Sequence, residues 1–483
     1  MKFKQLISTI IVIILSIIVL KKETDITESK ASDNKYRAFF EHSQDFDVFF
    51  LGTSHVINAV YPMELWHDYG ISSYNFGGHA NELATTYWVF KNALNYSKPK
   101  VVFVDCMLLG DQQKTWDDFS YVHLSLDAFP LSLTKINAIN DLLDDKVIVQ
   151  RISEGSLTVS EKRTKIGLLW DYSVYHPRWS ELSEGDFCPT SIKEYGAESR
   201  IYISKPGVVV NNPQTVLTEK TTGIEYLIKI IETCDENDID IVLMNLPFPV
   251  NTEKQWQEIN TVYTIADKYG VDYINFLDED VVDFNTDCYD SNSHLNPSGA
   301  LKVTDYLGKY ILSKYKNLSH TGDMNYNYMD TDYADYKSYK DSRFNEVEDL
   351  NTYLMLLQDY DYGFMMNIGD TSIFNDTTTL NLLKNKGVNI DELTDDTHYI
   401  ITYKNEVQLI RENINKNGQY GKFSIFFNAH NEYSVYVDNT ELFTTDSNTL
   451  SQQPNAISIC VFDLDNGSGL VDTSSFKTQA FTE

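Results

Sequence analysis

The chain has 483 residues, of which 42% are hydrophobic and 13% aromatic, enough for two or three packed domains. Its 39 basic and 70 acidic residues give a formal net charge of −31, which repels phosphate backbones and anionic lipid headgroups. Nucleic acid is therefore not expected as a partner. Five scattered cysteines argue against a disulfide framework or a structural zinc site, and no phosphate-binding glycine loop or His-Glu-x-x-His motif occurs. We expect no metal and no organic cofactor.

The N-terminus has the pattern of an export signal. Two lysines precede an uncharged apolar run, Leu6–Leu20, and two lysines follow it. The run is short for a bilayer core of about 30 Å, so it suits either a signal-peptide core or a short signal anchor. Because no good cleavage site follows, we expect a retained anchor over 1–22 and a polar tether over 23–45. The chain would then cross the cell membrane once, with its large acidic part on the extracellular side.

The next part of the chain, 46–318, alternates between strand and helix patterns. Strands are predicted at Asp47–Leu51, Ser73–Phe76, Val101–Asp105, Ile241–Asn245 and Val271–Phe276. Helices are predicted at Pro62–Tyr69, Glu82–Asn95, Thr222–Cys234, Lys254–Tyr269 and Pro297–Tyr315. This alternation predicts an α/β domain of three layers, with a parallel sheet covered on both faces.

Two stretches break the alternation. The interval 107–218, with the aromatic segment Leu168–Trp179, is an insertion that either forms a lid or substrate wall at the carboxyl ends of the strands or packs elsewhere. The interval 319–343 is rich in Asp, Tyr, Asn and Lys, and it predicts an interdomain linker. Beyond it, 344–483 shows short β-type runs between polar turns, which predict a β-rich accessory domain with one helix at Thr378–Lys386.

A serine stands where the first predicted strand ends. In the stretch FFLGTSHVI, Phe49–Ile57, Gly52 stops a buried strand and Ser54 begins a strand-to-helix turn. Ligands bind at the carboxyl ends of strands in parallel sheets, whereas serine is also an ordinary turn residue. A hydroxyl is a poor nucleophile at neutral pH unless a base removes its proton. A catalytic Ser54 therefore requires a histidine and a group that orients that histidine.

One histidine has the matching setting. His294, in DCYDSNSHLNPSGA, lies between the last predicted strand and the last predicted helix. The first and last strands of such a sheet end on the same rim, so we expect Ser54 and His294 to converge. Asp290 lies about one helical turn upstream, where its carboxylate can accept a hydrogen bond from the second imidazole nitrogen. Nucleophile, base and orienting carboxylate are then all present.

Three separated motifs resemble the SGNH, or GDSL-type, hydrolase superfamily. They are Gly52-Thr53-Ser54-His55 after the first strand, Asn75-Phe76-Gly77-Gly78 after the second, and Asp290 with His294-Leu295-Asn296 before the last helix. The N-terminal anchor and the H-L-N-x-x-G-A ending resemble the extracellular group that includes the teichoic acid D-alanylation and alginate O-acetylation proteins. The resemblance implies an SGNH-hydrolase-like, flavodoxin-like fold over 46–318. It also implies Ser54 as nucleophile, His294 as base, and the backbone amides of Ser54 and Gly78 in an oxyanion hole.

The chain departs from the family pattern at two points. The family spaces its acid and base as D-x-x-H, but Ser291 stands at that place here, so either Asp290 reaches His294 through a one-residue bulge or the site works as a weaker dyad. The third block, G-x-N-D, is absent because Cys106 follows the third strand. Asn81 then either supplies the missing oxyanion donor or caps a helix. Loss of one oxyanion donor costs roughly a hundredfold or more in rate.

Neighbouring residues are candidates for the lining of the pocket. His55 follows the candidate nucleophile, and Gly77 and His79 accompany Gly78. Structural packing is the alternative for each of the two histidines. Asp105 ends the third strand, where a carboxylate often caps the next turn.

The C-terminal part contains EYSVYVDNTELF, Glu432–Phe443, and AISICVFDLDNGSGLVDTSSF, Ala456–Phe476. With these stretches, Tyr353–Phe476 resembles the interleukin-like EMT inducer, or PANDER-like, domain. The resemblance implies carbohydrate binding, and a structural or partner-binding appendage is the alternative. The whole sequence predicts a membrane-tethered serine acyl-ester enzyme, an O-acetyltransferase or acetylesterase, whose substrate is a cell-surface glycan. The alternative is a catalytically weak or inactive glycan-binding scaffold. A transferase would need a polytopic partner that exports the acyl donor, such as a membrane-bound O-acyltransferase.

Overall fold

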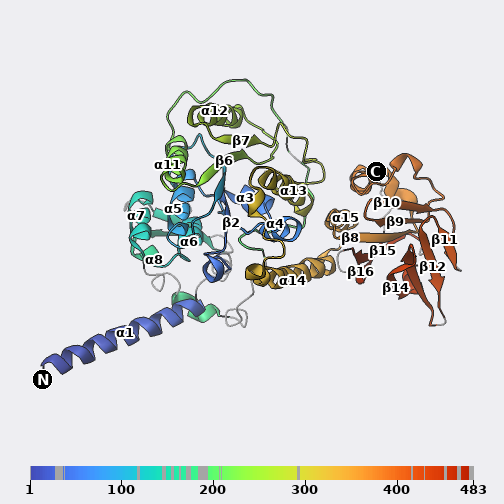
Figure 1. The fold of residues 1–483 in the computed structure, drawn as a ribbon, viewed down its shortest axis with the longest axis horizontal. Helices are drawn as coiled ribbons and strands as arrows, with labels where there is room; N and C mark the ends of the chain where they lie inside the picture. The colour runs from blue at the N-terminus through green and yellow to red at the C-terminus, as the bar shows by residue number, and fades with distance from the viewer. Residues whose placement is uncertain are drawn as a thin grey trace. The chain divides into compact units, whose positions relative to one another are not determined.

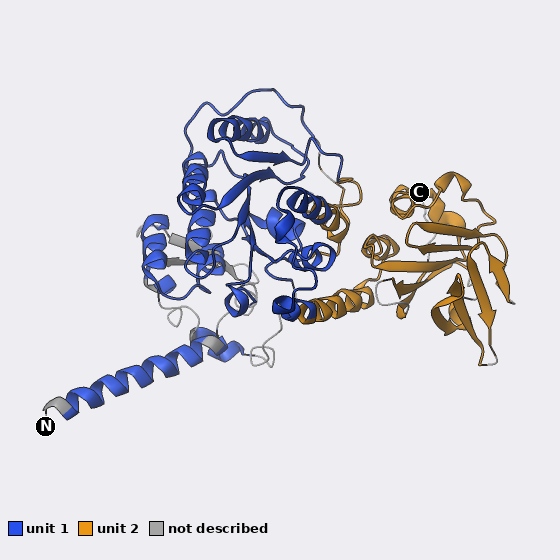
Figure 2. Cartoon of the chain, viewed as in Figure 1, with its two compact units in different colours: residues 1–198, 208–281, 304–330 blue, residues 199–207, 282–303, 331–483 orange. Residues whose placement is uncertain are grey.

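The computed structural model describes residues 2–27, 36, 38–116, 120–143, 148–153, 157–162, 165–169, 176–182, 194–205, 207, 209–290, 294–414, 417–428, 430–450, 454–464 and 469–477 (Figure 1). The chain divides into two compact units, coloured separately in Figure 2. The first unit comprises 1–198, 208–281 and 304–330, and the second comprises 199–207, 282–303 and 331–483. The division passes through two helices, α13 (Pro297–Lys314) and α14 (Asn327–Ser342).

A five-stranded sheet forms the centre of the first unit. Its strands are β1 (Val48–Gly52), β2 (Ser73–Gly77), β3 (Val101–Asp105), β6 (Asp240–Asn245) and β7 (Asp272–Asn275). Their spatial order is β2-β1-β3-β6-β7, and every pairing is parallel, as predicted. This is the 2-1-3-4-5 order of flavodoxin-like sheets, in which the strand order reverses between the first and third strands and ligands bind beyond the carboxyl ends at that point.

Helices cover both faces of this sheet (Figure 1). They are α3 (Ser54–Ala59), α4 (Pro62–Tyr69), α5 (Leu83–Ala93), α11 (Thr222–Glu236), α12 (Glu253–Tyr269) and α13. The α5 and α11 helices pack together on one face, with the rings of Tyr87 and Tyr226 5.7 Å apart. On the other face Tyr69 of α4 donates to the carbonyl of Asp305 in α13 at 3.3 Å. The strands β1, β2 and β3 are buried along their whole length, as continuous apolar runs in a covered parallel sheet should be.

The N-terminal helix α1 (Lys2–Thr27) is longer than the predicted anchor. Its segment Lys4–Thr24 has a mean hydropathy of 2.1, and within the described part of the chain it is the one helix long and apolar enough to cross a membrane. At about 1.5 Å per residue, its 21 residues extend roughly 30 Å, the thickness of a hydrocarbon core. A cleaved signal sequence and a retained anchor both fit this description.

The predicted insertion contains short elements. They are α6 (Ser120–Leu126), α7 (Leu133–Leu142), the antiparallel strands β4 (Ile148–Ser153) and β5 (Leu157–Lys162), α8 (Lys165–Leu169) and the 3₁₀ helix η1 (His176–Glu181). Part of the aromatic segment Leu168–Trp179, residues 170–175, lies outside the described residues. The short 3₁₀ helices η2 (Lys316–Leu318) and η3 (Met324–Tyr326) follow α13 in the first unit.

The second unit contains two antiparallel sheets, which confirms the predicted β-rich region. One sheet has the order β10-β9-β8-β15-β16 and the other β11-β12-β13-β14. The strands are β8 (Tyr362–Ile368), β9 (Tyr399–Tyr403), β10 (Glu406–Ile410), β11 (Gly418–Tyr420), β12 (Phe423–Phe427), β13 (Glu432–Val437), β14 (Thr440–Asp446), β15 (Ala456–Asp463) and β16 (Leu470–Lys477). The helical elements are η4 (Arg343–Glu346), α15 (Leu350–Leu356), η5 (Thr371–Asn375), α16 (Thr377–Asn385), η6 (Ile390–Glu392) and α17 (Ser447–Leu450).

The five-stranded antiparallel sheet is the middle layer of this unit. Side chains alternate along a strand, so Phe364 and Met366 of β8 pack with Leu382 of α16 in one core, whereas Met365 packs with Phe443 of the four-stranded sheet in another. One face of the sheet is thus covered by helices and the other by a sheet.

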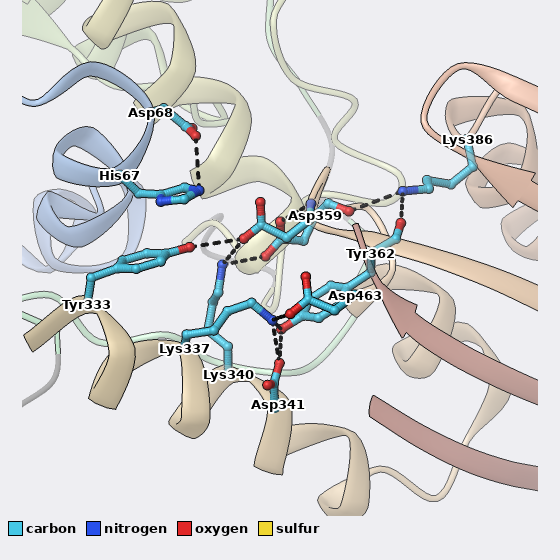
Figure 3. A network of polar contacts seen from close by, with 11 residues as sticks. His67, Asp68, Tyr333, Lys337, Lys340, Asp341, Asp359, Tyr362, Lys386 and Asp463 are labelled. Atoms are coloured by element: carbon cyan, nitrogen blue, oxygen red, sulfur yellow. Dashed lines mark hydrogen bonds and ion pairs between the residues drawn. The ribbon is translucent and has the colours of Figure 1, made fainter. Parts of the chain in front are cut away.

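The α14 helix occupies most of the segment predicted as a linker. From Thr331 onward it carries the buried Lys337 and the partly buried Lys340 into a polar network of the second unit (Figure 3). Lys340 Nζ lies 2.8 Å from Asp359 and 2.9 Å from Asp361, and Lys337 Nζ lies 2.8 Å from Asp341 and 3.3 Å from Asp463. This part of the segment is a packed helix because its lysines pair with carboxylates that would otherwise be buried without a countercharge.

Candidate active site

Ser54 is the first residue of α3, directly beyond the carboxyl end of β1. The preceding residue, Thr53, caps the helix, since its hydroxyl accepts a hydrogen bond from the N–H of His55 at 3.2 Å. The turn depends on Gly52, whose φ of +151° suits only glycine and whose Cβ would lie 2.7 Å from Val56 and 2.8 Å from Asp105. The Gly-Thr-Ser sequence therefore lets a strand become a helix within one residue and presents Ser54, half-buried, at the carboxyl rim.

The motif at the end of β2 supports the turn that precedes Ser54. The side-chain amide of Asn75 donates to the carbonyls of Val56 and Val60 at 2.7 and 2.8 Å, and its oxygen accepts from the N–H of Gly77. A Cβ on Gly77 would lie 2.8 Å from backbone atoms of Thr53 and Ile57. Asn75 and Gly77 thus hold α3 against β2 by packing, which is a structural role for two of the residues in this motif.

Gly78 does not offer the amide that the family resemblance implied. Its N–H donates to the carbonyl of Gly52 at 2.9 Å and is therefore engaged in the sheet. A Cβ on Gly78 would fall 2.0 Å from Nδ2 of Asn81, so glycine is needed here to admit the Asn81 side chain. The close contact between these two residues places the Asn81 amide beside the strand end from which Ser54 follows.

Asn81 is 1% exposed and its side chain is oriented by the insertion. The hydroxyl of Ser125 in α6 donates to Asn81 Oδ1 at 2.7 Å, while Asn81 Nδ2 has no hydrogen-bond partner among the described residues. Asn81 does not cap α5, whose N-cap is Glu82 without a side-chain bond. A buried amide donor without a partner is costly, so it is a candidate for a hydrogen bond to a ligand. The insertion therefore contacts this rim.

Asp105 is the last residue of β3, the strand that pairs with β1, and it lies at the carboxyl ends of these two strands. Its Oδ1 accepts from the N–H of Leu246 at 3.3 Å. Burial raises the pKa of the Asp105 carboxyl to about 7, and the hydrogen bond from the Leu246 N–H partly offsets that rise. Asp105 also packs beside the turn before Ser54, because a Cβ on Gly52 would lie 2.8 Å from the Cβ of Asp105.

In the second unit, Asp290 and His294 form a direct pair. His294 Nδ1 lies 2.9 Å from Asp290 Oδ2, and the N–H of His294 donates to Asp290 Oδ1 at 3.1 Å. The side chain of Asp290 is 32% exposed and that of His294 is 16% exposed. The imidazole of His294 stacks on the ring of Tyr289, with centroids 5.3 Å apart. Asp290 therefore reaches His294 despite the unusual spacing. Ser291, which stands at the usual position of the acid, lies outside the described residues.

Buried polar residues hold the base of the His294 loop. Asn296 donates to the carbonyl of Thr286 at 2.8 Å, and Cys288 and Leu295 form an isolated antiparallel bridge. Asp287 is fully buried between Ser298 Oγ at 2.7 Å and Lys302 Nζ at 2.7 Å. These contacts explain the Leu-Asn-Pro-Ser-Gly sequence after His294 as loop support. The α13 helix begins at Pro297, and within the first unit its Thr304 hydroxyl accepts from the N–H of Tyr61 at 3.0 Å.

The two other candidate histidines have packing partners. The ring of His55 is buried and packs edge to face against Phe248, 5.6 Å away. Nε2 of His79 lies 3.2 Å from Glu198. Each histidine thus has a structural contact of the kind that the sequence left open as the alternative.

A group of buried acids beside Asn81 was missed from the sequence. Burial raises the pKa of Glu82 to about 7 and that of Glu258 to about 7. Gln113 donates to Glu82 at 2.7 Å, and Lys254 lies 2.6 Å from Asp111 and 3.5 Å from Glu258. Glu82 follows β2, Asp111 and Gln113 follow β3, and Lys254 and Glu258 follow β6, so all lie beyond carboxyl ends of the sheet. Their burial depends on tertiary packing, which no local pattern shows.

The structure therefore brings together Gly52, Gly77, Gly78 and Asn81 in the first unit, and Asp290 and His294 in the second. No cluster of three or more His, Cys, Asp or Glu side chains suited to a metal ion occurs in the described ranges. Comparisons with protein-family models, curated proteins and solved structures gave no match.

Proposed function

We propose that the protein is an extracytoplasmic serine acyl-ester enzyme, an O-acetyltransferase or acetylesterase for a cell-surface polysaccharide. The observation that carries the proposal is the bond between His294 Nδ1 and Asp290, which orients an imidazole as a general base. A serine at the carboxyl end of β1, where strand order reverses, is the second requirement of such a site. The proposal requires Ser54 Oγ and His294 Nε2 to come within hydrogen-bonding reach.

The reaction proceeds in two halves. Ser54 Oγ attacks the ester carbonyl while His294 Nε2 takes the hydroxyl proton, and the C–O bond to the leaving alcohol then breaks as His294 returns the proton to it. In the second half an acceptor hydroxyl attacks the acyl-Ser54 ester, its proton passes through His294 to Ser54 Oγ, and the enzyme is restored. Water as acceptor gives hydrolysis, and a sugar hydroxyl gives transfer.

We assign the oxyanion to the backbone N–H of Ser54 and the side-chain amide of Asn81. The amide of Gly78 is used by Gly52, whereas Asn81 Nδ2 is buried next to Gly78 without a partner among the described residues. Preorganised donors of this kind stabilise the charge that develops on the carbonyl oxygen. Asn81 then takes the place of the asparagine that the third family block supplies in SGNH hydrolases, the family that the motifs of 46–318 resemble.

The setting of the enzyme follows from the N-terminal helix. We propose that α1 is a retained anchor and that the rest of the chain lies outside the cell. For transfer, a polytopic membrane-bound O-acyltransferase would deliver the acyl group, because a single apolar helix cannot carry a donor across the membrane. The net charge of −31 would repel the phosphate backbone of a nucleic acid, so we expect no nucleic-acid partner.

Hydrolysis of p-nitrophenyl acetate by the full chain in mild detergent tests the proposal. Wild-type protein should release p-nitrophenol above the rate in buffer, and both Ser54→Ala and His294→Gln should lose at least a hundredfold of that rate. Asp47→Asn is the control, because Asp47 also forms a partly buried pair with a histidine, His320, at 2.6 Å. Asp47 lies at the amino end of β1, opposite the end that Ser54 follows. Equal rates in the wild type and Ser54→Ala would contradict the proposal.

A glycan-binding scaffold without catalysis is the second candidate, and one surface favours it. On the outward face of the four-stranded sheet, Phe426 is 47% exposed and its ring meets that of Tyr436 edge to face at 5.5 Å. Hydroxyl and carboxylate groups surround this pair, since Ser424 donates to Gln419 and Tyr436 donates to Glu441. Aromatic rings among hydrogen-bonding groups suit saccharide recognition. Retained binding of a neutral polysaccharide by Ser54→Ala, without turnover in the wild type, would favour the scaffold.

A further inference from the structure

The C-terminal end of α1 is bonded to a short helix that exposes a tryptophan. Arg178 of η1 donates from Nη1 to the carbonyl of Thr27, the last residue of α1, at 2.6 Å. The next residue, Trp179, is 63% exposed. Figure 1 shows α1 ending beside η1, although the two helices are far apart in the sequence. The insertion therefore supplies a partner for a helix end whose carbonyls lack one within the helix.

The position of this contact along α1 sets its depth. The apolar segment ends at Thr24, so Thr27 lies three residues beyond it, about 5 Å along the helix axis. If Lys4–Thr24 fills the hydrocarbon core, the Thr27 carbonyl and Arg178 lie in the headgroup layer. Tryptophan is enriched at this depth, because its ring is apolar and its indole N–H needs a polar partner.

Chain length independently keeps the first unit close to the membrane. Tyr36 is 1% exposed and its ring packs against Phe76 and Phe129 at 6.0 and 5.2 Å, so the chain has entered the core of the first unit by that residue. Eight residues lie between Thr27 and Tyr36, so nine Cα-to-Cα steps join them, and a fully extended chain of that length spans about 30 Å at most. The predicted tether of 23–45 is thus too short to let the first unit move far from the bilayer surface.

From these observations we propose that η1 docks on the outer surface of the bilayer, with Trp179 inserted at the level of the lipid headgroups. The proposal rests on the retained anchor of the proposed function. Docking by an aromatic side chain suits a chain of net charge −31, which anionic headgroups would repel. The bond from Arg178 to Thr27 then fixes the height of the first unit above the membrane, which keeps the rim near Ser54 at a constant distance from lipid.

Quenching of tryptophan fluorescence by brominated lipids tests the docking. The full chain is reconstituted in phosphatidylcholine vesicles with bromine at a shallow or a deep position of the acyl chain. The α1 helix contains no tryptophan, so its insertion alone causes no quenching. Wild-type protein should be quenched more by shallow than by deep bromine, and Trp179→Phe should lose at least half of the quenched signal. The quenching should also persist in high salt, because an inserted ring is held by apolar burial rather than by charge.

Trp256→Phe is the matched control. Trp256 packs against Phe248, Val250 and Ile259, and its indole N–H donates to Val210 at 2.7 Å, so its loss should leave the quenched fraction unchanged. Equal quenching in Trp179→Phe and the wild type overturns the proposal, as does an intact mass that lacks the apolar segment of α1. Hydrolysis of p-nitrophenyl acetate by the same vesicles, compared with Ser54→Ala, tests the catalytic proposal separately. The two proposals can therefore fail independently.

Discussion

His294 and Asp290 are joined by two hydrogen bonds, one from the imidazole Nδ1 at 2.9 Å and one from the backbone N–H at 3.1 Å. The two oxygens of one carboxylate thus fix both the ring and the backbone of the same residue. The pair defines the tautomer in which Nδ1 carries the proton and Nε2 is the basic nitrogen.

Replacement of this acid should reduce catalysis without unfolding the protein. Asp290→Asn retains the shape of the side chain but cannot stabilise an imidazolium, so we expect kcat/KM for p-nitrophenyl acetate to fall on the order of 10²- to 10⁴-fold. Asp47→Asn removes the carboxylate from the comparable His320 pair and should change the rate by less than about threefold. A rate for Asp290→Asn within threefold of the wild type would show that the pair serves only to hold the loop.

The side chain of Asn81 should contribute to the rate and not to binding of the ground state. We expect Asn81→Ala to lower kcat on the order of 10²- to 10³-fold with little change in KM, because the donor acts on charge that appears in the transition state. Asn92→Ala is the control, since Asn92 is equally buried on the neighbouring helix α5 but donates to Trp88. If both variants lose activity in parallel with stability, the role of Asn81 is structural.

The strongest apolar and alternating patterns were sufficient to predict the parallel sheet. The bounds of α4 and β3 agree with the residues predicted from local pattern. The α3 helix was missed because it is only six residues long and its ends are held by Thr53 and by the distant side chain of Asn75. Helix α14 was missed because its buried side, which includes Tyr336 and Lys337, contains no aliphatic residue from Thr331 onward. A repeat of aromatic residues and lysines at helical spacing was the available signal.

Predictions at the candidate site were limited in the same way. Residue type and order in the sequence selected Ser54, Asp290 and His294 as candidates, and the structure adds the bond between the last two. The hydrogen bond from Gly78 to Gly52 could not be anticipated, because it depends on the register of β1 and β2. Whether Asn81 caps a helix or faces a ligand likewise depends on a contact with Ser125, which is distant in sequence.

The carboxyl of Asp105 should make the stability of the first unit depend on pH. Its pKa is raised to about 7 by burial, from an ordinary value of 3.8. A raised pKa means that the folded state holds the proton more tightly. The stability from this group is therefore complete below about pH 3.8 and is lost as the pH rises through 7. Between pH 5 and 8 the loss amounts to at most about 2.5 kcal/mol in the free energy of unfolding.

Asp105→Asn removes this titration and should therefore reduce the fall in the free energy of unfolding between pH 5 and 8. All six tryptophans lie between Trp66 and Trp256 in the first unit, so urea unfolding followed by tryptophan fluorescence reports on that unit. Glu82 and Glu258 also have raised pKa values, but both titrate in wild type and variant alike and cancel in the comparison. Equal loss of stability from pH 5 to 8 in the two proteins would mean that Asp105 is ionised throughout.

The network around Lys340 should stabilise the second unit selectively. Lys340 lies between the buried carboxylate of Asp359 and the partly buried carboxylate of Asp361, and burial together with Asp361 raises the pKa of Asp359. Lys340→Met removes the countercharge and leaves two neighbouring carboxylates in a poorly solvated place, which should destabilise the unit by about 3–5 kcal/mol. Calorimetry should show one transition moved to lower temperature, while unfolding seen by tryptophan fluorescence in the first unit remains unchanged.

Lys422→Met, which breaks an exposed pair with Glu406 in the same unit, should leave both transitions in place. An unchanged transition in Lys340→Met would indicate that water already solvates the two carboxylates and that α14 is held by its tyrosines.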